Sequence, residues 1–269
     1  MAKFNAADFA VTKAKPLPII MLLDESGSMG ERLGDGVKID VLNHAVKTML
    51  ATLSKEESQA SEFLITAIAF GDRELQARYL TGETPMPASD VLYSDLKANW
   101  NTPLDKALAM AKGLIEDKAK IPSRSYRPLV ILVCDGMPDY GWEAPLDDFV
   151  NNGRTSKCDR MALAVGCQKG DAAWEMLECF VRGTDNPVFT ADQAADIVKF
   201  FKFVTMSVTQ RAKSKDPNQL APVKDVLMLQ SGDAAIAKVE AIADNSDGAI
   251  IVDAVVVEPD EDEEEGFRW

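Results

Sequence analysis

Carboxylate and hydroxyl side chains follow two apolar runs of the sequence, at the point where each run ends. Residues 17–23 (LPIIMLL) lead into Asp24-Glu-Ser26-Gly-Ser28, and residues 129–134 (LVILVC) lead into Asp135-Gly136. A third hydroxyl, Thr102, precedes a proline at the start of an amphipathic segment. These oxygen donors are hard ligands, suited to an octahedral cation that keeps some of its water, so they favour Mg²⁺ or Mn²⁺ over Zn²⁺. We therefore predict a metal site formed by Asp24, Ser26, Ser28, Thr102 and Asp135.

The elements that must position these residues alternate between strand and helix. Short apolar runs, typical of strands buried on both faces of a sheet, occupy residues 17–23, 63–70, 129–134 and 161–165, with shorter strands at 77–80 and 188–189. Apolar residues at helical spacing predict helices over residues 39–53, 103–115, 145–150, 172–181 and 191–211. This order predicts an α/β fold of three layers: an open, mostly parallel, Rossmann-like sheet with helices on both faces. Ligand sites in such sheets lie at the carboxyl ends of the strands.

The five predicted ligands, in this order and at these strand ends, resemble the metal-ion-dependent adhesion site of von Willebrand factor type A (VWA) domains. The resemblance covers roughly residues 14–211. It implies that Ser26, Ser28 and Thr102 contact the metal directly, and that Asp24 and Asp135 act mostly through water. It also implies that a protein partner supplies an acidic residue to complete the coordination.

Within that family, two short segments resemble bacterial tellurium-resistance proteins of the TerY type: Asp135-Gly-Met-Pro-Asp139 and Phe200-Phe201-Lys202-Phe203. This resemblance implies a role in stress-response or phage-defence signalling, beside a kinase, a phosphatase or an ATPase of the same system. Two features depart from the pattern. Asn99-Trp100-Asn101 stands where the family usually has glycines before the threonine, and the chain ends in an acidic segment instead of a cysteine-rich one.

Each predicted ligand also has a purely structural interpretation. Asp24 and Asp135-Gly136 are good turn formers, the two serines could satisfy loop amides, and Thr102 could cap a helix that begins at Pro103. The joint pattern favours the metal site. A nucleotide-binding loop is disfavoured because the segment after Asp24 has neither Gly-x-Gly-x-x-Gly nor a Walker lysine. Trp100, Tyr140 and Trp142 fall in loops near the predicted site, where exposed aromatic side chains anchor interfaces; a packing role in the fold is an equal alternative for them.

No histidine or lysine accompanies Ser26 and Ser28 as a base, so the sequence favours a non-enzymatic protein-binding module. A Mg²⁺-dependent phosphoester hydrolase stays open as an alternative because a metal-bound water can act as a nucleophile. A third interpretation is an adaptor subunit of an AAA-ATPase or chelatase-type complex.

The amino-acid composition restricts which classes of partner and which cellular compartment are expected. The formal charge of −14 repels nucleic acid and anionic membranes alike, and no apolar run approaches the length of a membrane span. The four cysteines form no zinc motif, and the only histidine, His44, is expected to be a solvated helix residue, so we expect reduced thiols and a cytoplasmic protein. We divide the chain into a domain of residues 1–213, an extension of residues 214–257, and an acidic tail of residues 258–269 with seven acids against one arginine, expected to be disordered.

Overall fold

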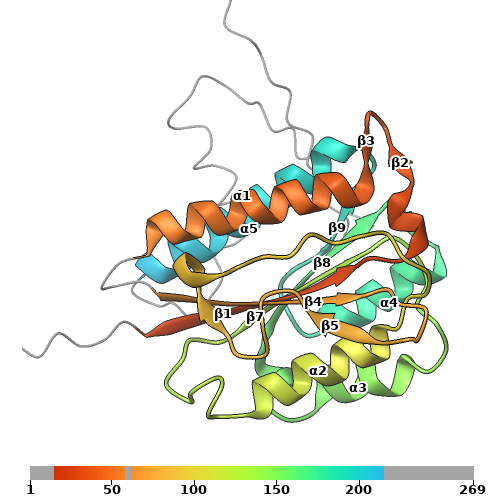
Figure 1. The fold of residues 1–269 in the computed structure, drawn as a ribbon. Coiled ribbons are helices and arrows are strands. Elements are labelled where there is room, and N and C mark those ends of the chain that lie inside the picture. Colours follow the sequence, from red (N-terminus) through yellow and green to blue (C-terminus); the bar gives the residue numbers. More distant parts are fainter. Residues whose placement is uncertain (1–14, 58–61, 215–269) are drawn as a thin grey trace, which may run out of the picture.

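Five parallel strands form the centre of the sheet in the computed structural model, which describes residues 15–57 and 62–214 (Figure 1). In spatial order they are β4 (Glu62–Phe70), β1 (Pro16–Asp24), β7 (Leu129–Cys134), β8 (Asp159–Val165) and β9 (Val188–Ala191). Two short strands, β5 (Ala77–Tyr79) and β6 (Met86–Pro87), pair antiparallel with β4 and complete a seven-stranded sheet. A separate hairpin of β2 (Arg32–Leu33) and β3 (Gly36–Val37) precedes the first helix.

Both faces of the sheet are covered by helices, because its strands are apolar on both sides. Alternate residues of β1 point to opposite faces: Leu17, Ile19 and Met21 belong to one core, and Ile20 and Leu22 to the other. The first core is closed by α1 (Lys38–Glu56) and α5 (Ala194–Lys213), which lie side by side in Figure 1. The second is closed by α2 (Leu104–Glu116), α3 (Glu143–Asn151) and α4 (Ala172–Val181). The predicted three-layer α/β fold is confirmed.

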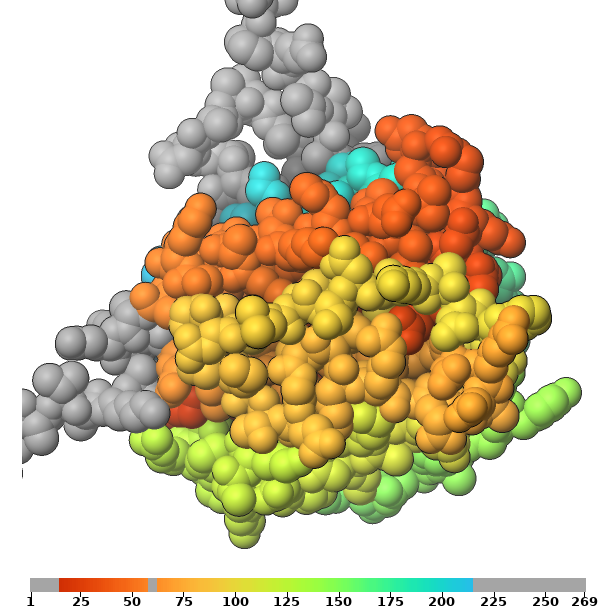
Figure 2. All heavy atoms as spheres, in the orientation of Figure 1, coloured from red at the N-terminus to blue at the C-terminus, as the bar shows by residue number. Residues whose placement is uncertain are grey.

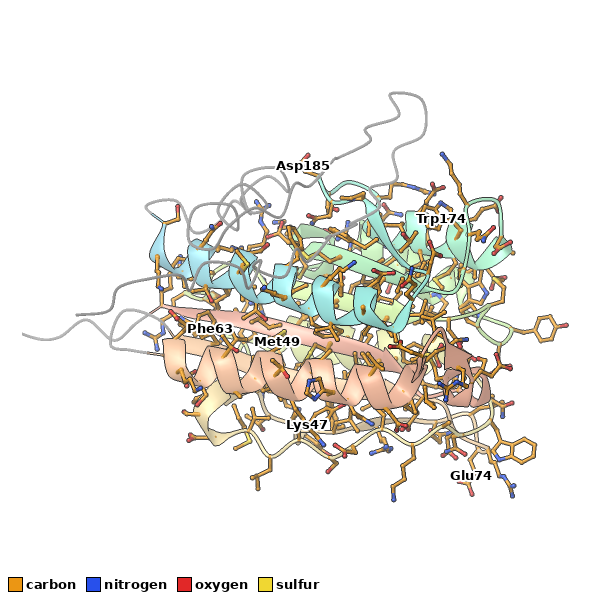
Figure 3. The ribbon with its side chains drawn as sticks, turned by 90° about the horizontal axis from the view of Figure 1, so that it is seen from above. Lys47, Met49, Phe63, Glu74, Trp174 and Asp185 are labelled. Atoms are coloured by element: carbon orange, nitrogen blue, oxygen red, sulfur yellow. The ribbon has the colours of Figure 1, made fainter. Side chains whose placement is uncertain are left out.

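Strand register brings the two polar strand ends together. Leu23 is paired with Val133 of β7 and Asp24 with Phe70 of β4, so the residues that follow β1 and β7 emerge at one edge of the sheet. Figure 3 makes the direction visible: Phe63, near the start of β4, and Glu74, in the loop after β4, lie at opposite ends of the molecule. The predicted ligands therefore gather at the carboxyl edge, at the Glu74 end.

A long segment without a helix or strand leads from the 3₁₀ helix η3 (Ala88–Asp90) to α2 and forms much of the face seen in Figure 2 (yellow). The buried Asn43 of α1 fixes it at Leu96: the Asn43 amide donates to the Leu96 carbonyl (3.0 Å), and the Leu96 N–H donates to Asn43 Oδ1 (2.8 Å). This double hydrogen bond guides the chain towards Trp100 and Thr102 at the carboxyl edge.

Most predicted elements agree with the structure to within a few residues, and the differences are local. The short strand β6 was not predicted. Helix α2 begins at Leu104, with Pro103 as its N-cap, so the interpretation of Thr102 as the cap of this helix is wrong. The β2–β3 hairpin was not predicted. The extension and the acidic tail lie outside the described residues, apart from Ser214. Within the described ranges, no helix combines the length and apolar character needed to cross a membrane.

Candidate metal centre

The loop after β1 is held rigidly from both sides. The Ser26 N–H donates to Asp24 Oδ1 (2.7 Å), and the chain then enters the 3₁₀ helix η2 (Gly27–Gly30). Between them, the buried Glu25 carboxylate binds the Arg78 guanidinium through two hydrogen bonds, of 3.0 and 2.7 Å. A side chain at position 27 would place its Cβ 2.8 Å from the Asn99 carbonyl oxygen, so glycine is required there. The two serines therefore have little freedom to move apart.

Three oxygen-bearing side chains from two loops meet at this point. The Ser26 and Ser28 hydroxyls lie 3.1 Å apart, and the Ser28 hydroxyl donates to Asp135 Oδ1 at 2.7 Å. Ser26 Oγ lies 3.5 Å from the same carboxylate oxygen. Asp24 is hydrogen-bonded to the backbone of this group, because its Oδ2 accepts the Asp135 N–H at 3.4 Å. The structure thus brings four of the five predicted ligands together.

The fifth predicted ligand, Thr102, lies in the adjoining loop. Its N–H donates to Asp139 Oδ2 (2.6 Å) and its carbonyl accepts the Asp139 N–H (3.0 Å), which ties the α2 loop to the loop after β7. The loop before α2 also contacts the loop after β1, because the Gly27 N–H donates to the Trp100 carbonyl at 3.5 Å. In the described structure no hydrogen bond joins the Thr102 hydroxyl to the two serines or the two aspartates.

Burial and charge repulsion act together on Asp24. Its carboxyl group is fully buried, and burial, with the nearby Asp135 charge as a second cause, raises the pKa of Asp24 from 3.8 to about 6. The Cys134 thiol donates to Asp24 Oδ2 at 3.1 Å and is itself buried, so its pKa is raised and it stays protonated. Cys134 ends the apolar run of residues 129–134, which the sequence predicts as a buried strand, and its burial agrees with that prediction. A cation placed near the two carboxylates would relieve their mutual repulsion.

Lys38 is the residue that the sequence did not single out. It is the first residue of α1, and its Nζ lies 2.9 Å from Asp135 Oδ2. Nothing in the sequence distinguishes it from a solvated lysine at the start of a helix. Its place beside Asp135 depends on the β2–β3 hairpin, which returns the chain to the carboxyl edge before α1 begins.

The donor set fits a hard divalent cation. Two neutral hydroxyls and a carboxylate oxygen face one another at hydrogen-bond distance, and the Lys38 ammonium already acts as a stand-in cation on Asp135. Across residues 15–57 and 62–214, no three His, Cys, Asp or Glu side chains cluster closely enough to hold a metal ion. A metal centre here therefore depends on the serine hydroxyls.

Exposed apolar side chains lie at the same edge of the sheet as the candidate centre. Leu75, Trp100, Met137 and Tyr140 are 43%, 63%, 45% and 103% exposed, and each lies in a loop at the carboxyl edge of the sheet. The Arg73 guanidinium stacks 4.4 Å from the centre of the Trp100 ring. Trp142 precedes α3 in the loop after β7 and packs partly against the core. His44 is exposed on α1, as expected.

Comparison with solved structures identifies the architecture. No protein-family model matches the chain. The von Willebrand factor type A protein of Catenulispora acidiphila superposes with a TM-score of 0.50 and 18% identity, over 72% of this chain and 43% of that one. The vWF domain of the type V pili tip protein Mfa5 from Porphyromonas gingivalis superposes with a TM-score of 0.52 and 12% identity, over 80% of this chain and 100% of that one. This is a VWA fold.

Two further matches define how far the likeness extends. The pilus adhesin SpaC of Lactobacillus rhamnosus GG superposes with a TM-score of 0.54 and 15% identity, and the match spans 72% of this chain but only 30% of the adhesin. In sequence, the large ribosomal subunit protein uL10 of Fervidobacterium nodosum is 26% identical over an alignment of 156 residues, with 55% of this chain and 77% of that protein covered. At this identity the match establishes neither family nor function.

Proposed function

We propose that this chain is a non-enzymatic protein-interaction module that binds Mg²⁺ or Mn²⁺ and captures a carboxylate of a protein partner. Ser26, Ser28 and Thr102 would hold the ion as neutral ligands, and Asp24 and Asp135 would supply the negative charge. The ion would supply an electrophilic centre for the partner's carboxylate. The observation that carries the proposal is the meeting of Ser26, Ser28 and Asp135 at the carboxyl edge of a VWA fold.

The rim of exposed apolar residues supports a protein partner. Trp100 is exposed in the loop before α2 and Tyr140 in the loop after β7, and aromatic side chains of this kind are frequent anchors in interfaces. A carboxylate alone would give a weak and unselective contact. An acidic side chain flanked by apolar residues on the partner would use both parts of this surface.

The biological setting is proposed from the TerY-type resemblance. On that basis the acidic partner belongs to a bacterial stress-response system and is a kinase, a phosphatase or an ATPase subunit, and the chain acts in the cytoplasm.

A retention experiment tests the function. The intact protein and Ser28→Ala are immobilised and exposed to native cell extract in Mg²⁺ or in chelator. Ser123→Ala is the matched control, because Ser123 is exposed in the loop before β7, at the opposite edge of the sheet. The proposal expects a protein retained by the intact chain and by Ser123→Ala in Mg²⁺ only. Equal retention by Ser28→Ala, or retention in chelator, would contradict it. Turnover of a generic phosphoester that Ser28→Ala abolishes would favour the hydrolase alternative instead.

A further inference from the structure

The Lys38–Asp135 contact is a buried ion pair. The side chains of Lys38 and Asp135 are 9% and 0% exposed, and their charged atoms lie 2.9 Å apart. The second acidic neighbour of Lys38, Glu31, is 3.7 Å away and has a largely exposed side chain. Two charges that are both removed from water interact far more strongly than a surface pair of the same length. Asp135 is therefore the main partner of Lys38.

The backbone keeps the lysine in this place. The Lys38 N–H donates to the Glu31 carbonyl at 3.0 Å, which closes the hairpin loop, and the adjacent Ile39 is buried in the core under α1. On the other side, a Cβ at Gly166 would lie 3.9 Å from Lys38 Cε and 4.0 Å from its Nζ. The end of the lysine is thus enclosed between Asp135 and the turn after β8.

Charge at the centre depends on this lysine. With both carboxylates ionised, Asp24 and Asp135 carry two negative charges, and Lys38 compensates one of them. Asp135 presents Oδ2 to the ammonium and Oδ1 to the Ser28 hydroxyl, so one carboxylate serves both the lysine and the predicted ligand set. Any cation that approaches Oδ1 meets a positive charge fixed on the other oxygen of the same group, which weakens its binding.

We propose that Lys38 is a built-in cation of the candidate metal centre, which holds Asp135 in place without metal and lowers the affinity of the centre for divalent ions. This inference rests on the proposed function. It follows that a divalent ion bound beside Lys38 keeps an excess of positive charge. That excess favours the binding of a further carboxylate, so metal and partner support each other's binding.

The affinity for Mn²⁺ tests the proposal directly. Free Mn²⁺ is measured by electron paramagnetic resonance in titrations of the full chain, Lys38→Met, Lys38→Gln and Lys47→Met. Lys47→Met is the matched control, because Lys47 lies on the same helix and pairs with Asp95 at 2.7 Å in an exposed position. Lys38→Gln keeps a hydrogen-bond donor for Asp135 without the charge, and it provides the test if the methionine variant does not fold. Circular dichroism in chelator checks folding.

The proposal expects both uncharged Lys38 variants to bind Mn²⁺ at least about tenfold more tightly than the intact chain, a difference of about 1.4 kcal/mol. Lys47→Met should match the intact chain. Folded Lys38 variants that bind Mn²⁺ with unchanged or weaker affinity would overturn the role of Lys38 and leave the proposed function standing. Binding by the Lys38 variants alone would support that role but contradict the proposed function, because the ammonium would then take the place of the metal in the intact chain. Absence of binding in every protein would overturn both proposals.

Discussion

Replacing Asp24 by asparagine in the metal-free protein should change the pH dependence of folding stability in a defined direction. The pKa of Asp24 is raised from 3.8 to about 6 by burial and by the charge of Asp135. A raised carboxyl pKa means that the fold prefers the neutral form. The contribution of protonated Asp24 to folding stability is complete below the unfolded-state pKa of 3.8, and it is lost as the pH rises through about 6. The shift corresponds to about 3 kcal/mol between the two limits.

Asparagine cannot ionise, so the variant lacks this pH-dependent loss. The quantity to compare is the free energy of unfolding of Asp24→Asn minus that of the intact chain, measured by urea titration in chelator. We expect this difference to rise by up to about 3 kcal/mol between about pH 4 and about pH 7.5. At low pH this difference in unfolding free energy reports the cost of altered hydrogen bonds. The Cys134 thiol and the Asp135 N–H both donate to Asp24 Oδ2, and asparagine cannot accept both hydrogen bonds in the same way.

Asp105→Asn is the control, because Asp105 pairs with Lys106 on the surface of α2 and belongs to no buried cluster. Its difference from the intact chain should change little over the same pH range. If the Asp24→Asn difference does not vary with pH, burial and the Asp135 charge do not raise the pKa of Asp24 as described, and the account of the centre's electrostatics is wrong. Adding Mg²⁺ at neutral pH should lower the difference again, because the intact chain should be stabilised by metal and Asp24→Asn much less.

Three other changes test separate parts of the structure. Gly71→Ala should lower the free energy of unfolding, measured by urea titration, by about 2–4 kcal/mol. The reason is that Gly71 has φ 156° and that a Cβ there would clash with the Glu25 carbonyl carbon. An unchanged free energy of unfolding would mean that the Glu25 loop is not tightly held. Arg160→Met should cost about 3 kcal/mol, because the buried guanidinium donates to the carbonyls of Phe180, Thr155, Cys158 and Arg182; the same titration would contradict this if the stability were unchanged. Trp100→Ala and Tyr140→Ala should reduce partner retention while leaving Mn²⁺ affinity within about twofold of the intact chain, and unchanged retention would remove the apolar rim from the interface.

The fold could be predicted from the sequence because its central strands are continuous apolar runs. Residues 17–23 and 129–134 can only be buried on both faces, and parallel strands bring their carboxyl ends to one edge. This reasoning was sufficient to bring Asp24, Ser26, Ser28 and Asp135 together. The side chain of Thr102 could not be placed in the same way, because its position depends on where α2 begins and on the Asp139 hydrogen bonds.

The sequence pattern could not predict which charged side chains are buried. Arg160 stands in β8 next to an aspartate and is polar by type, yet it is buried. Its guanidinium donates to carbonyls of two segments, the residues just before β8 and the end of α4. Lys38 is similar: only the return of the β2–β3 hairpin puts its ammonium beside Asp135. Both roles arise from contacts between segments that are distant in sequence, and periodicity carries no information about those contacts.

A crystal structure of the intact chain grown with Mn²⁺ would test the metal centre most directly, through the anomalous signal of the ion. The proposed function predicts one strong peak beside Asp135, at about 2.1 Å from the Ser26 and Ser28 hydroxyl oxygens. It would be contradicted by a map with no peak there at saturating Mn²⁺, with Ser28 and Lys38 still bound to Asp135 as they are now.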